Sequence, residues 1–209
     1  REDDQRQHDR RVVQCLGERE HTRRLARVTA ESTLIDELRT HALVIGEVTL
    51  TSGKTASYYV DAKRAILKPR GFLALGELVA AQATAWNAEA VGGMTMGADP
   101  VACAALAGGF TGDAFFVRKE AKQHGLQRRV EGPLLEPGTR CVIVEDVVTT
   151  GGSTVAAIEA VLEAGHEIVG VISVLDRLEG GADRISAASG GAPYRACATI
   201  ADVYPDRST

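Results

Sequence analysis

The chain has 209 residues, of which 44% are hydrophobic and 25% charged, and its formal net charge is −4. This length and apolar content suit one folded domain, with or without an appendage, and exclude a fully disordered chain. The weakly negative charge disfavours a nucleic-acid-binding protein, which needs a cationic face. No apolar run reaches the roughly 18 residues of a membrane-spanning helix.

The first 31 residues differ in composition from the rest of the chain. They contain eight Arg and seven acidic residues but few aliphatic ones, and they lack the apolar stretch of a secretory signal peptide. We predict a charged, non-catalytic N-terminal extension over residues 1–31 and a single domain over residues 32–209.

The four cysteines are too far apart for a zinc-binding motif or a redox dithiol: Cys15, Cys103, Cys141 and Cys197. This usage favours a reducing, cytoplasmic compartment. Because Cys103 and Cys141 lie in apolar runs, we expect both to be small buried core residues.

The pattern of a folded domain begins at Thr33. Four aliphatic residues recur at helical spacing and predict a short amphipathic helix: Leu34, Ile35, Leu38 and Leu43. Residues 47–54 and 57–61 predict two strands around a Ser-Gly turn. The Ala- and Leu-rich segment 72–86 predicts a helix, and Trp86 at its end is expected to be a packing residue.

Short apolar strands then alternate with helices. Strands are predicted over residues 88–92, 114–117, 141–147 and 168–175, and helices over 99–107 and 154–164. Val- and Ile-rich runs separated by helices indicate a parallel sheet covered on both faces. The predicted fold class is therefore α/β, with a doubly wound, mainly parallel sheet.

The segment with the most chemistry follows the strand over 141–147. Glu145 and Asp146 lie at the carboxyl end of this strand, where open α/β sheets bind ligands. The Thr- and Gly-rich loop 149–154 then leads into a helix. Glycines let backbone N–H groups approach an anion, hydroxyls add donors, and the helix N-terminus supplies positive potential. These features predict a phosphate-binding loop.

The acidic pair restricts the kind of phosphate ligand. The loop is neither a Walker A motif nor a G-x-G-x-x-G dinucleotide turn. Two carboxylates would repel the phosphate chain of a nucleotide, but they suit the vicinal hydroxyls of a ribose. The predicted ligand is a sugar 5-phosphate bound at both ends.

A second polar segment runs from Arg118 to Pro133. It contains five Arg or Lys residues and His124, and it follows an apolar strand. A cationic loop of this length predicts a mobile lid over an anionic substrate. Such a lid could neutralise a departing diphosphate while excluding water.

The sequence Glu-Asp-Val-Val-Thr-Thr-Gly-Gly-Ser at 145–153 resembles the signature of type I phosphoribosyltransferases, which bind 5-phosphoribosyl 1-diphosphate (PRPP). The resemblance implies that family's fold, with a small N-terminal hood and a flexible catalytic loop. It places Glu145 and Asp146 on the ribose hydroxyls. It places the 5-phosphate on the segment made of Val147, Val148, Thr149, Thr150, Gly151, Gly152 and Ser153.

The cationic loop is similar to the catalytic loop of the orotate phosphoribosyltransferase branch. The resemblance places Arg118, Lys119, Lys122 and His124 on the diphosphate, with Lys122 as the principal transition-state cation. It also implies a homodimer in which loop 118–132 acts in the neighbouring subunit's site. The Leu-Asp-Arg sequence at 175–177 matches a later element of that branch, so Arg177 and Thr149 are the predicted orotate contacts.

The implied reaction gives orotidine 5′-monophosphate and diphosphate from orotate and PRPP, a step toward UMP. The resemblance implies Mg²⁺ held mainly by PRPP and water, and no nucleic-acid or membrane partner. Thr51 and the loop 93–98 lack lysines that many members carry there, which predicts weaker PRPP binding. Two alternatives stay open: a purine-specific phosphoribosyltransferase and a non-catalytic PRPP-binding regulator. The roles of Asp61 and Lys63 also stay open.

Overall fold

The computed structural model describes residues 29–49, 55–120 and 129–207. Its centre is a six-stranded sheet in the order β5-β4-β3-β6-β7-β8. The strands are β3 (Ala90–Met94), β4 (Asp113–Val117), β5 (Val130–Glu131), β6 (Arg140–Val148), β7 (Glu167–Asp176) and β8 (Tyr194–Thr199). Every pairing is parallel except that of β4 with β5. The predicted doubly wound, mainly parallel sheet is confirmed.

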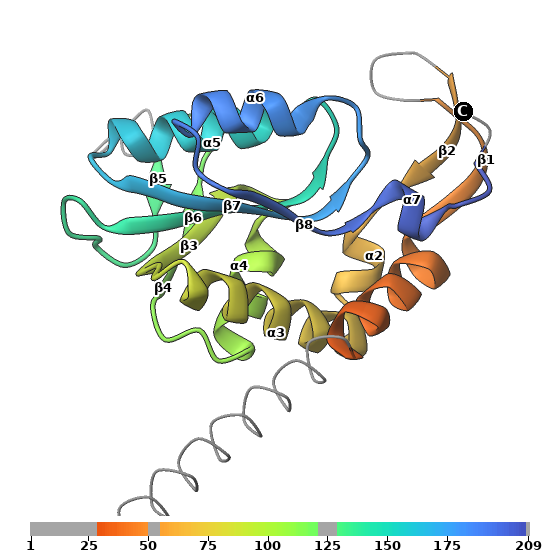
Figure 1. The fold of residues 1–209 in the computed structure, drawn as a ribbon, viewed down its shortest axis with the longest axis horizontal. Coiled ribbons are helices and arrows are strands. Elements are labelled where there is room, and N and C mark those ends of the chain that lie inside the picture. The colour runs from red at the N-terminus through yellow and green to blue at the C-terminus, as the bar shows by residue number, and fades with distance from the viewer. Residues whose placement is uncertain (1–28, 50–54, 121–128, 208–209) are drawn as a thin grey trace, which may run out of the picture.

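Helices cover both faces of this sheet. Helices α3 (Pro69–Ala85) and α4 (Asp99–Ala107) lie on one side, and α5 (Gly152–Glu163) and α6 (Gly181–Ala188) lie on the other (Figure 1). Residues 29–37 form a helix that continues as the π-helix η1 (Leu38–Ala42) and packs in the same core as α3.

The side chains of β6 divide between the two cores with the period of two that a strand imposes. Val142 and Val144 pack in the core with α3 and α4, whereas Cys141 and Ile143 pack in the core with α5. All four side chains are completely buried. Beyond the acidic pair the order changes, because Val147 packs in the core with α3 and α4 and Val148 packs in the core with α5.

A small N-terminal hood lies beside one end of the sheet. It consists of the antiparallel strands β1 (Leu43–Thr49) and β2 (Thr55–Val60), followed by α2 (Lys63–Ile66), and α7 (Ile200–Val203) lies next to it (Figure 1). The Tyr58 ring meets that of Tyr204 edge-on, with centroids 5.7 Å apart. Leu43 was predicted to be helical, but the backbone becomes extended at this residue, so the first strand begins earlier than expected.

The other predicted helices and strands are confirmed to within about three residues. Trp86 is a packing residue, because a Cβ added at Gly170 would lie 2.1 Å from its ring. The prediction for Cys141 is confirmed, and burial raises the pKa of its thiol to about 12. The prediction for Cys103 is wrong: this residue lies on the exposed side of α4, since an apolar run does not by itself decide which helix face is buried.

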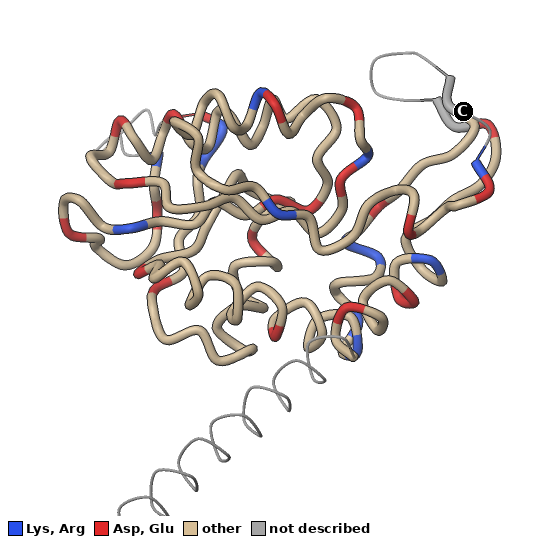
Figure 2. The backbone as a smooth tube through the Cα atoms, in the orientation of Figure 1, with Lys and Arg blue, Asp and Glu red and all other residues tan. Residues whose placement is uncertain are grey.

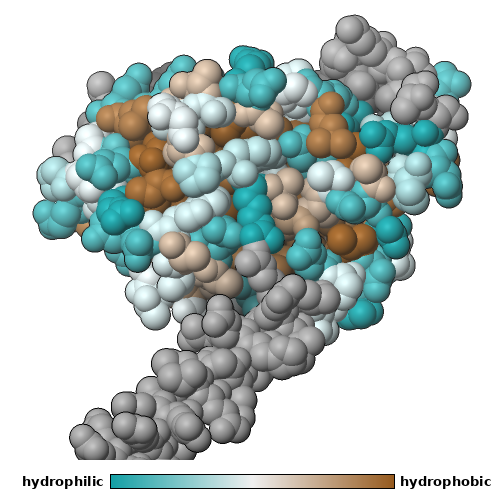
Figure 3. All heavy atoms as spheres, in the orientation of Figure 1, coloured by the Kyte–Doolittle hydropathy of each residue, from teal (hydrophilic) through white to brown (hydrophobic). Residues whose placement is uncertain are grey.

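The surface is mixed in charge and polarity. Lys and Arg positions alternate with Asp and Glu positions over several elements of the described chain (Figure 2). On the face shown in Figure 3, apolar side chains form patches separated by polar surface. Within the described residues, no helix has the length and apolar character needed to cross a membrane.

Candidate active site

The site lies where the order of the strands reverses. From β3 the chain proceeds to β4 on one side, and from β6 it proceeds to β7 and β8 on the other, although β3 and β6 are neighbours. In open α/β sheets such a reversal of strand order marks a crevice at the carboxyl ends of the strands, where ligands bind. The backbone of the β3 loop approaches β6 so closely that a Cβ at Gly97 would lie 2.4 Å from Oδ1 of Asp146.

The two acidic residues at this edge point in different directions. Because residues of β6 alternate between the faces, Glu145 continues the side of Cys141 and Ile143, and Asp146 continues the opposite side. Glu145 accordingly meets the start of α5: the hydroxyls of Ser153 and Thr154 donate to its Oε2 at 2.8 and 3.1 Å. Both acidic residues are buried, with 4% and 9% exposure.

Glu145 differs from an ordinary carboxyl group in its affinity for a proton. Burial, followed by the negative charge of Asp146, raises the pKa of Glu145 to about 7, although the Ser153 and Thr154 hydroxyls act in the opposite direction. The group therefore titrates near neutral pH, as groups at functional sites often do.

Within the described residues, Asp146 has a cationic partner and Glu145 has none. Its Oδ1 accepts the backbone N–H of Val147 at 2.9 Å, and its Oδ2 accepts Nζ of Lys63 at 2.8 Å. Nζ also lies 3.1 Å from Oδ1 of Asp61. Burial would lower the pKa of Lys63, but the hydrogen bonds and charges of Asp146 and Asp61 outweigh it and raise that pKa above its usual value. Lys63 is a site residue whose role the sequence left open.

The predicted phosphate loop is a tight turn into α5. Gly151 precedes the first helical residue with a φ of 76°, a left-handed conformation that glycine adopts without strain. The first N–H groups of any α-helix lack a partner within the helix, so this end offers donors to an anion. Nη1 of Arg184 donates to the carbonyl of Thr150 at 2.9 Å and fixes the loop from α6.

Arg177 follows β7 directly and lies over the hood. Its backbone N–H donates to the Val148 carbonyl at 2.9 Å, which ties it to the end of β6. Its guanidinium carbon lies 5.1 Å from the centre of the Tyr58 ring, and Nη2 lies 2.9 Å from Oε1 of Glu179. The Nε atom is buried and has no hydrogen-bond partner within the described residues. A buried donor without a partner calls for an explanation, and a bound ligand is one.

The cationic loop is described only at its two ends. Lys122 and His124 belong to residues 121–128, which lie outside the described residues. The N–H of Arg118 donates to the carbonyl of Arg129 at 2.9 Å, so the two ends of the loop are adjacent. Nη1 of Arg118 lies 3.3 Å from Oε1 of Glu131, whereas Lys119 is exposed.

Comparisons with known proteins agree with this geometry. The family model of the phosphoribosyl transferase domain matches residues 85–191. An orotate phosphoribosyltransferase from Corynebacterium glutamicum is 48% identical over 177 residues, which cover 84% of this chain and 95% of that protein. The chain belongs to the orotate phosphoribosyltransferase family.

Solved structures of orotate phosphoribosyltransferases extend the comparison. One from Mycobacterium tuberculosis H37Rv has a TM-score of 0.76 and 43% identity, covering 84% of this chain and 99% of that one. Another structure of that enzyme, in complex with PRPP, has a TM-score of 0.71 and 37% identity and covers 83% of this chain and 98% of that one. The expected type I phosphoribosyltransferase fold is confirmed.

The predicted site residues of this orotate phosphoribosyltransferase family member come together in part. The structure brings the acidic pair, loop 149–153 and Arg177 to one edge of the sheet. Arg118 pairs with Glu131. Sequence reasoning did not select Tyr58 and did not assign Lys63. The signal for both was the segment 58–63, where aromatic, acidic and basic residues follow one another directly.

Two further features bear on cofactors and ligands. No group of three or more His, Cys, Asp or Glu side chains in the described part of the chain is arranged to hold a metal ion.

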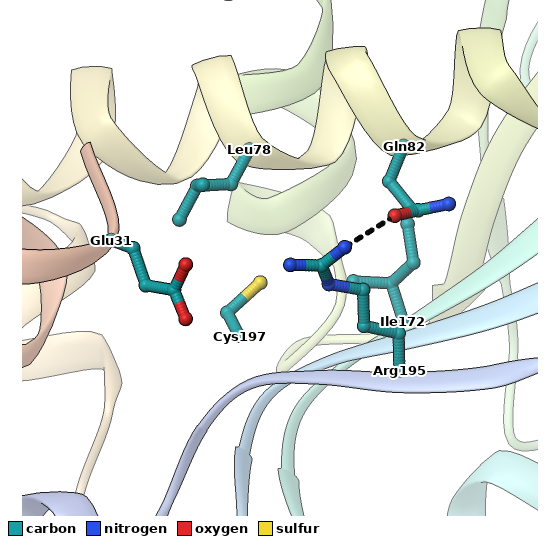
Figure 4. A pocket seen from close by; sticks show the side chains of 6 residues that line it. All are labelled: Glu31, Leu78, Gln82, Ile172, Arg195 and Cys197. Atoms are coloured by element: carbon teal, nitrogen blue, oxygen red, sulfur yellow. Dashed lines mark hydrogen bonds between the residues drawn. The ribbon is translucent and has the colours of Figure 1, made fainter. Parts of the chain in front are cut away.

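A separate cavity of about 10 Å³, the space of roughly one water molecule, lies between α3 and the strands β7 and β8 (Figure 4). It is lined by Glu31, Leu78, Gln82, Ile172, Arg195 and Cys197, and Arg195 donates to Gln82 at 2.7 Å.

Proposed function

We propose that this chain transfers the 5-phosphoribosyl group of PRPP to N1 of orotate, giving orotidine 5′-monophosphate and diphosphate. The observation that carries the proposal is the arrangement at the strand-order reversal. A buried acidic pair and a Thr-Gly loop lie at the end of β6, and a guanidinium with a free buried donor follows the adjacent β7. The similarity to orotate phosphoribosyltransferases supports it.

In this proposal Glu145 and Asp146 accept hydrogen bonds from the ribose hydroxyls of PRPP. Both carboxylates lie at the carboxyl end of one strand, so a ribose bound at this edge of the sheet can contact both. The backbone N–H groups and hydroxyls of residues 147–153 bind the 5-phosphate at the N-terminus of α5. A PRPP complex of the enzyme from Mycobacterium tuberculosis H37Rv, similar in fold, supports this choice of substrate.

Arg177 and Thr149 bind orotate. The planar guanidinium matches a planar carboxylate, which orotate carries and uracil does not. The Tyr58 ring restricts the guanidinium from the hood side. Purine bases lack such a carboxylate, so Arg177 favours an orotate-specific phosphoribosyltransferase over a purine-specific one.

The cationic loop acts on the diphosphate. Arg118, Lys119, Lys122 and His124 would neutralise the leaving group, with Lys122 the main transition-state cation. As the C1 bond breaks, the ribose ring develops oxocarbenium character, as expected for transfer from C1 of a sugar. Glu145 and Asp146 then hold the ribose near the developing positive charge.

Mg²⁺ is the proposed cofactor. It would be bound mainly by oxygens of PRPP and by water, since hard cations prefer oxygen ligands and Mg²⁺ usually retains several waters. The donors near the site fit this arrangement, because the acidic pair is already engaged by Lys63 and by hydroxyls. When bound, the ion would neutralise charge on the diphosphate.

The proposed assembly is a homodimer in which loop 118–132 completes the partner's site. Exposed apolar side chains next to the start of α3 support a protein–protein interface: Leu67 is 63% exposed and Leu73 is 62% exposed. The extension over residues 1–31 is proposed to be non-catalytic, and residues 1–28 lie outside the described residues. The proposed compartment is the cytoplasm, to which the buried thiol of Cys141 is suited.

The test is an absorbance assay with purified protein, PRPP and Mg²⁺. Orotate absorbance should fall as orotidine 5′-monophosphate forms, and a reaction without PRPP should show no change. Conversion of adenine or hypoxanthine without conversion of orotate would favour the purine-specific alternative. PRPP binding without conversion of any base would favour the regulator.

A further inference from the structure

We propose that Lys63 is a positioning residue for Asp146, and that it keeps this carboxylate aimed at the ribose hydroxyls of PRPP. The inference rests on the proposed function of the acidic pair, and it assigns a role to a residue of the hood. Its basis is the arrangement Asp61–Lys63–Asp146, in which Nζ lies 3.1 Å from one carboxylate and 2.8 Å from the other.

Lys63 is held by a rigid part of the chain. Its backbone N–H donates to Oδ1 of Asp61 at 3.2 Å, and the N–H of Asp61 donates to the carbonyl of Ala42 at 3.0 Å. Ala65 and Ile66 of the same helix are completely buried. The first turn of α2 therefore presents the side chain of Lys63 from a fixed backbone.

Asp146 needs such a partner because of where β6 places it. Its side chain is only 13% exposed and lies close to the backbone of Gly97. The neighbouring Glu145 is also buried and adds a like charge when ionised. The loop 93–98, which includes Gly97, contains no Lys or Arg. A buried carboxylate with no cation beside it would carry an uncompensated desolvation cost and would tend to rotate away from this position.

The contact leaves Asp146 able to bind a sugar. A carboxylate has about four lone-pair positions, and the described contacts use one from Val147 and one from Lys63. The side chain of Lys63 is 39% exposed, so the ion pair is not sealed off from a ligand. The ion pair can therefore stay in place while the ribose hydroxyls donate to the remaining positions.

Steady-state kinetics of Lys63→Met and Lys63→Arg test this role. Loss of the cation should raise the KM for PRPP by about tenfold and change the KM for orotate by less than about twofold. Lys63→Arg should restore most of the PRPP affinity. Arg64→Met, which removes an exposed cation from the same helix, is the matched control and should behave as wild type. Melting temperatures of all variants identify any that are misfolded.

Two further measurements separate positioning from a direct contact with the diphosphate. Ribose 5-phosphate carries the hydroxyls but no diphosphate, and Lys63→Met should weaken its binding in calorimetry. In a double-mutant cycle, Lys63→Met should add little to Asp146→Asn. Additive effects, weakened binding of PRPP but not of ribose 5-phosphate, or an unchanged PRPP KM in a folded and active protein would each overturn the proposal. An inactive wild-type protein would instead overturn the proposed function.

Discussion

The guanidinium of Arg177 lies 5.1 Å from the centre of the Tyr58 ring, which joins the end of β7 to the hood. The neighbouring Asp176 accepts the N–H of Leu178 at 2.7 Å and the hydroxyl of Tyr194 at 2.9 Å, so the turn that carries Arg177 is fixed from both sides. The buried Nε of this side chain has no hydrogen-bond partner within the described residues, and we expect a carboxylate ligand to supply one.

Replacement of Arg177 should weaken orotate binding selectively. In Arg177→Met the KM for orotate should rise by about 100-fold, because a charge-assisted, two-pronged contact is lost. The KM for PRPP should stay within about twofold of wild type, and Arg177→Lys should recover only part of the loss.

The control for this prediction is uracil, which has the pyrimidine ring without the carboxylate. Any conversion of uracil should proceed at the same rate in wild type and in Arg177→Met. Equal losses for orotate and uracil would mean that Arg177 acts on the fold of the site and not on the carboxylate.

Glu145 should make the protein less stable as the pH rises. Because its pKa in the folded protein is about 7 instead of 4.5, the folded state holds the proton more tightly than the unfolded state does. The stability from this group is complete below about pH 4.5 and is lost as the pH rises through 7. The Gln side chain of Glu145→Gln does not ionise, so this variant does not lose that stability. Its melting temperature relative to wild type should therefore rise by about 5 °C between pH 5 and pH 8.

The matched control is Glu159→Gln, which changes an exposed carboxylate on α5. It should show no such difference between the two pH values. Glu145→Gln should also lose PRPP affinity, so stability and activity change in opposite directions. A variant that is less stable than wild type at pH 8 would contradict the assigned titration.

Lys122 should affect the chemical step more than substrate binding. Lys122→Ala should lower kcat by about 100-fold, as expected when one donor to a developing anion is removed, and orotate binding should change little. Mixing Lys122→Ala with Asp146→Asn subunits should restore activity if the loop acts across the dimer, because one site in each heterodimer keeps both residues. Absence of recovery after verified subunit exchange would show that the loop acts within its own subunit.

The fold could be predicted where the sequence is strongly patterned. Buried runs such as those of β6 and β7 and the helix α4 were predicted because Val, Ile and Ala fill them. The elements missed were α2, β5, α6, β8 and α7. Of these, α2, β5 and α7 have two to four residues. The edge strand β8 has a partly polar composition, with Tyr194 and Arg195 in its first half, which hides the strand pattern.

The site could be predicted as a set of residues but not as a set of contacts. The strand pattern over 141–147 and the Thr-Gly sequence after it predicted that the acidic pair lies at the end of β6, next to the turn into α5. Glu145 accepts hydrogen bonds from hydroxyls of α5, which depends on how that helix packs on the sheet. Asp146 contacts Lys63, which is more than eighty positions away in the sequence. Neither contact can be predicted from the local sequence. Arg118 was assigned to the diphosphate from the resemblance of the loop to that of the orotate phosphoribosyltransferase branch, and its pairing with Glu131 depends on the short strand β5.

A crystal structure with PRPP and Mg²⁺ bound tests the assignment of the acidic pair most directly. We predict ribose hydroxyls within hydrogen-bond distance of the Glu145 and Asp146 carboxylates, and the 5-phosphate on the backbone N–H groups of residues 149–153. A diphosphate group on that loop, or a ribose that contacts neither carboxylate, would contradict it.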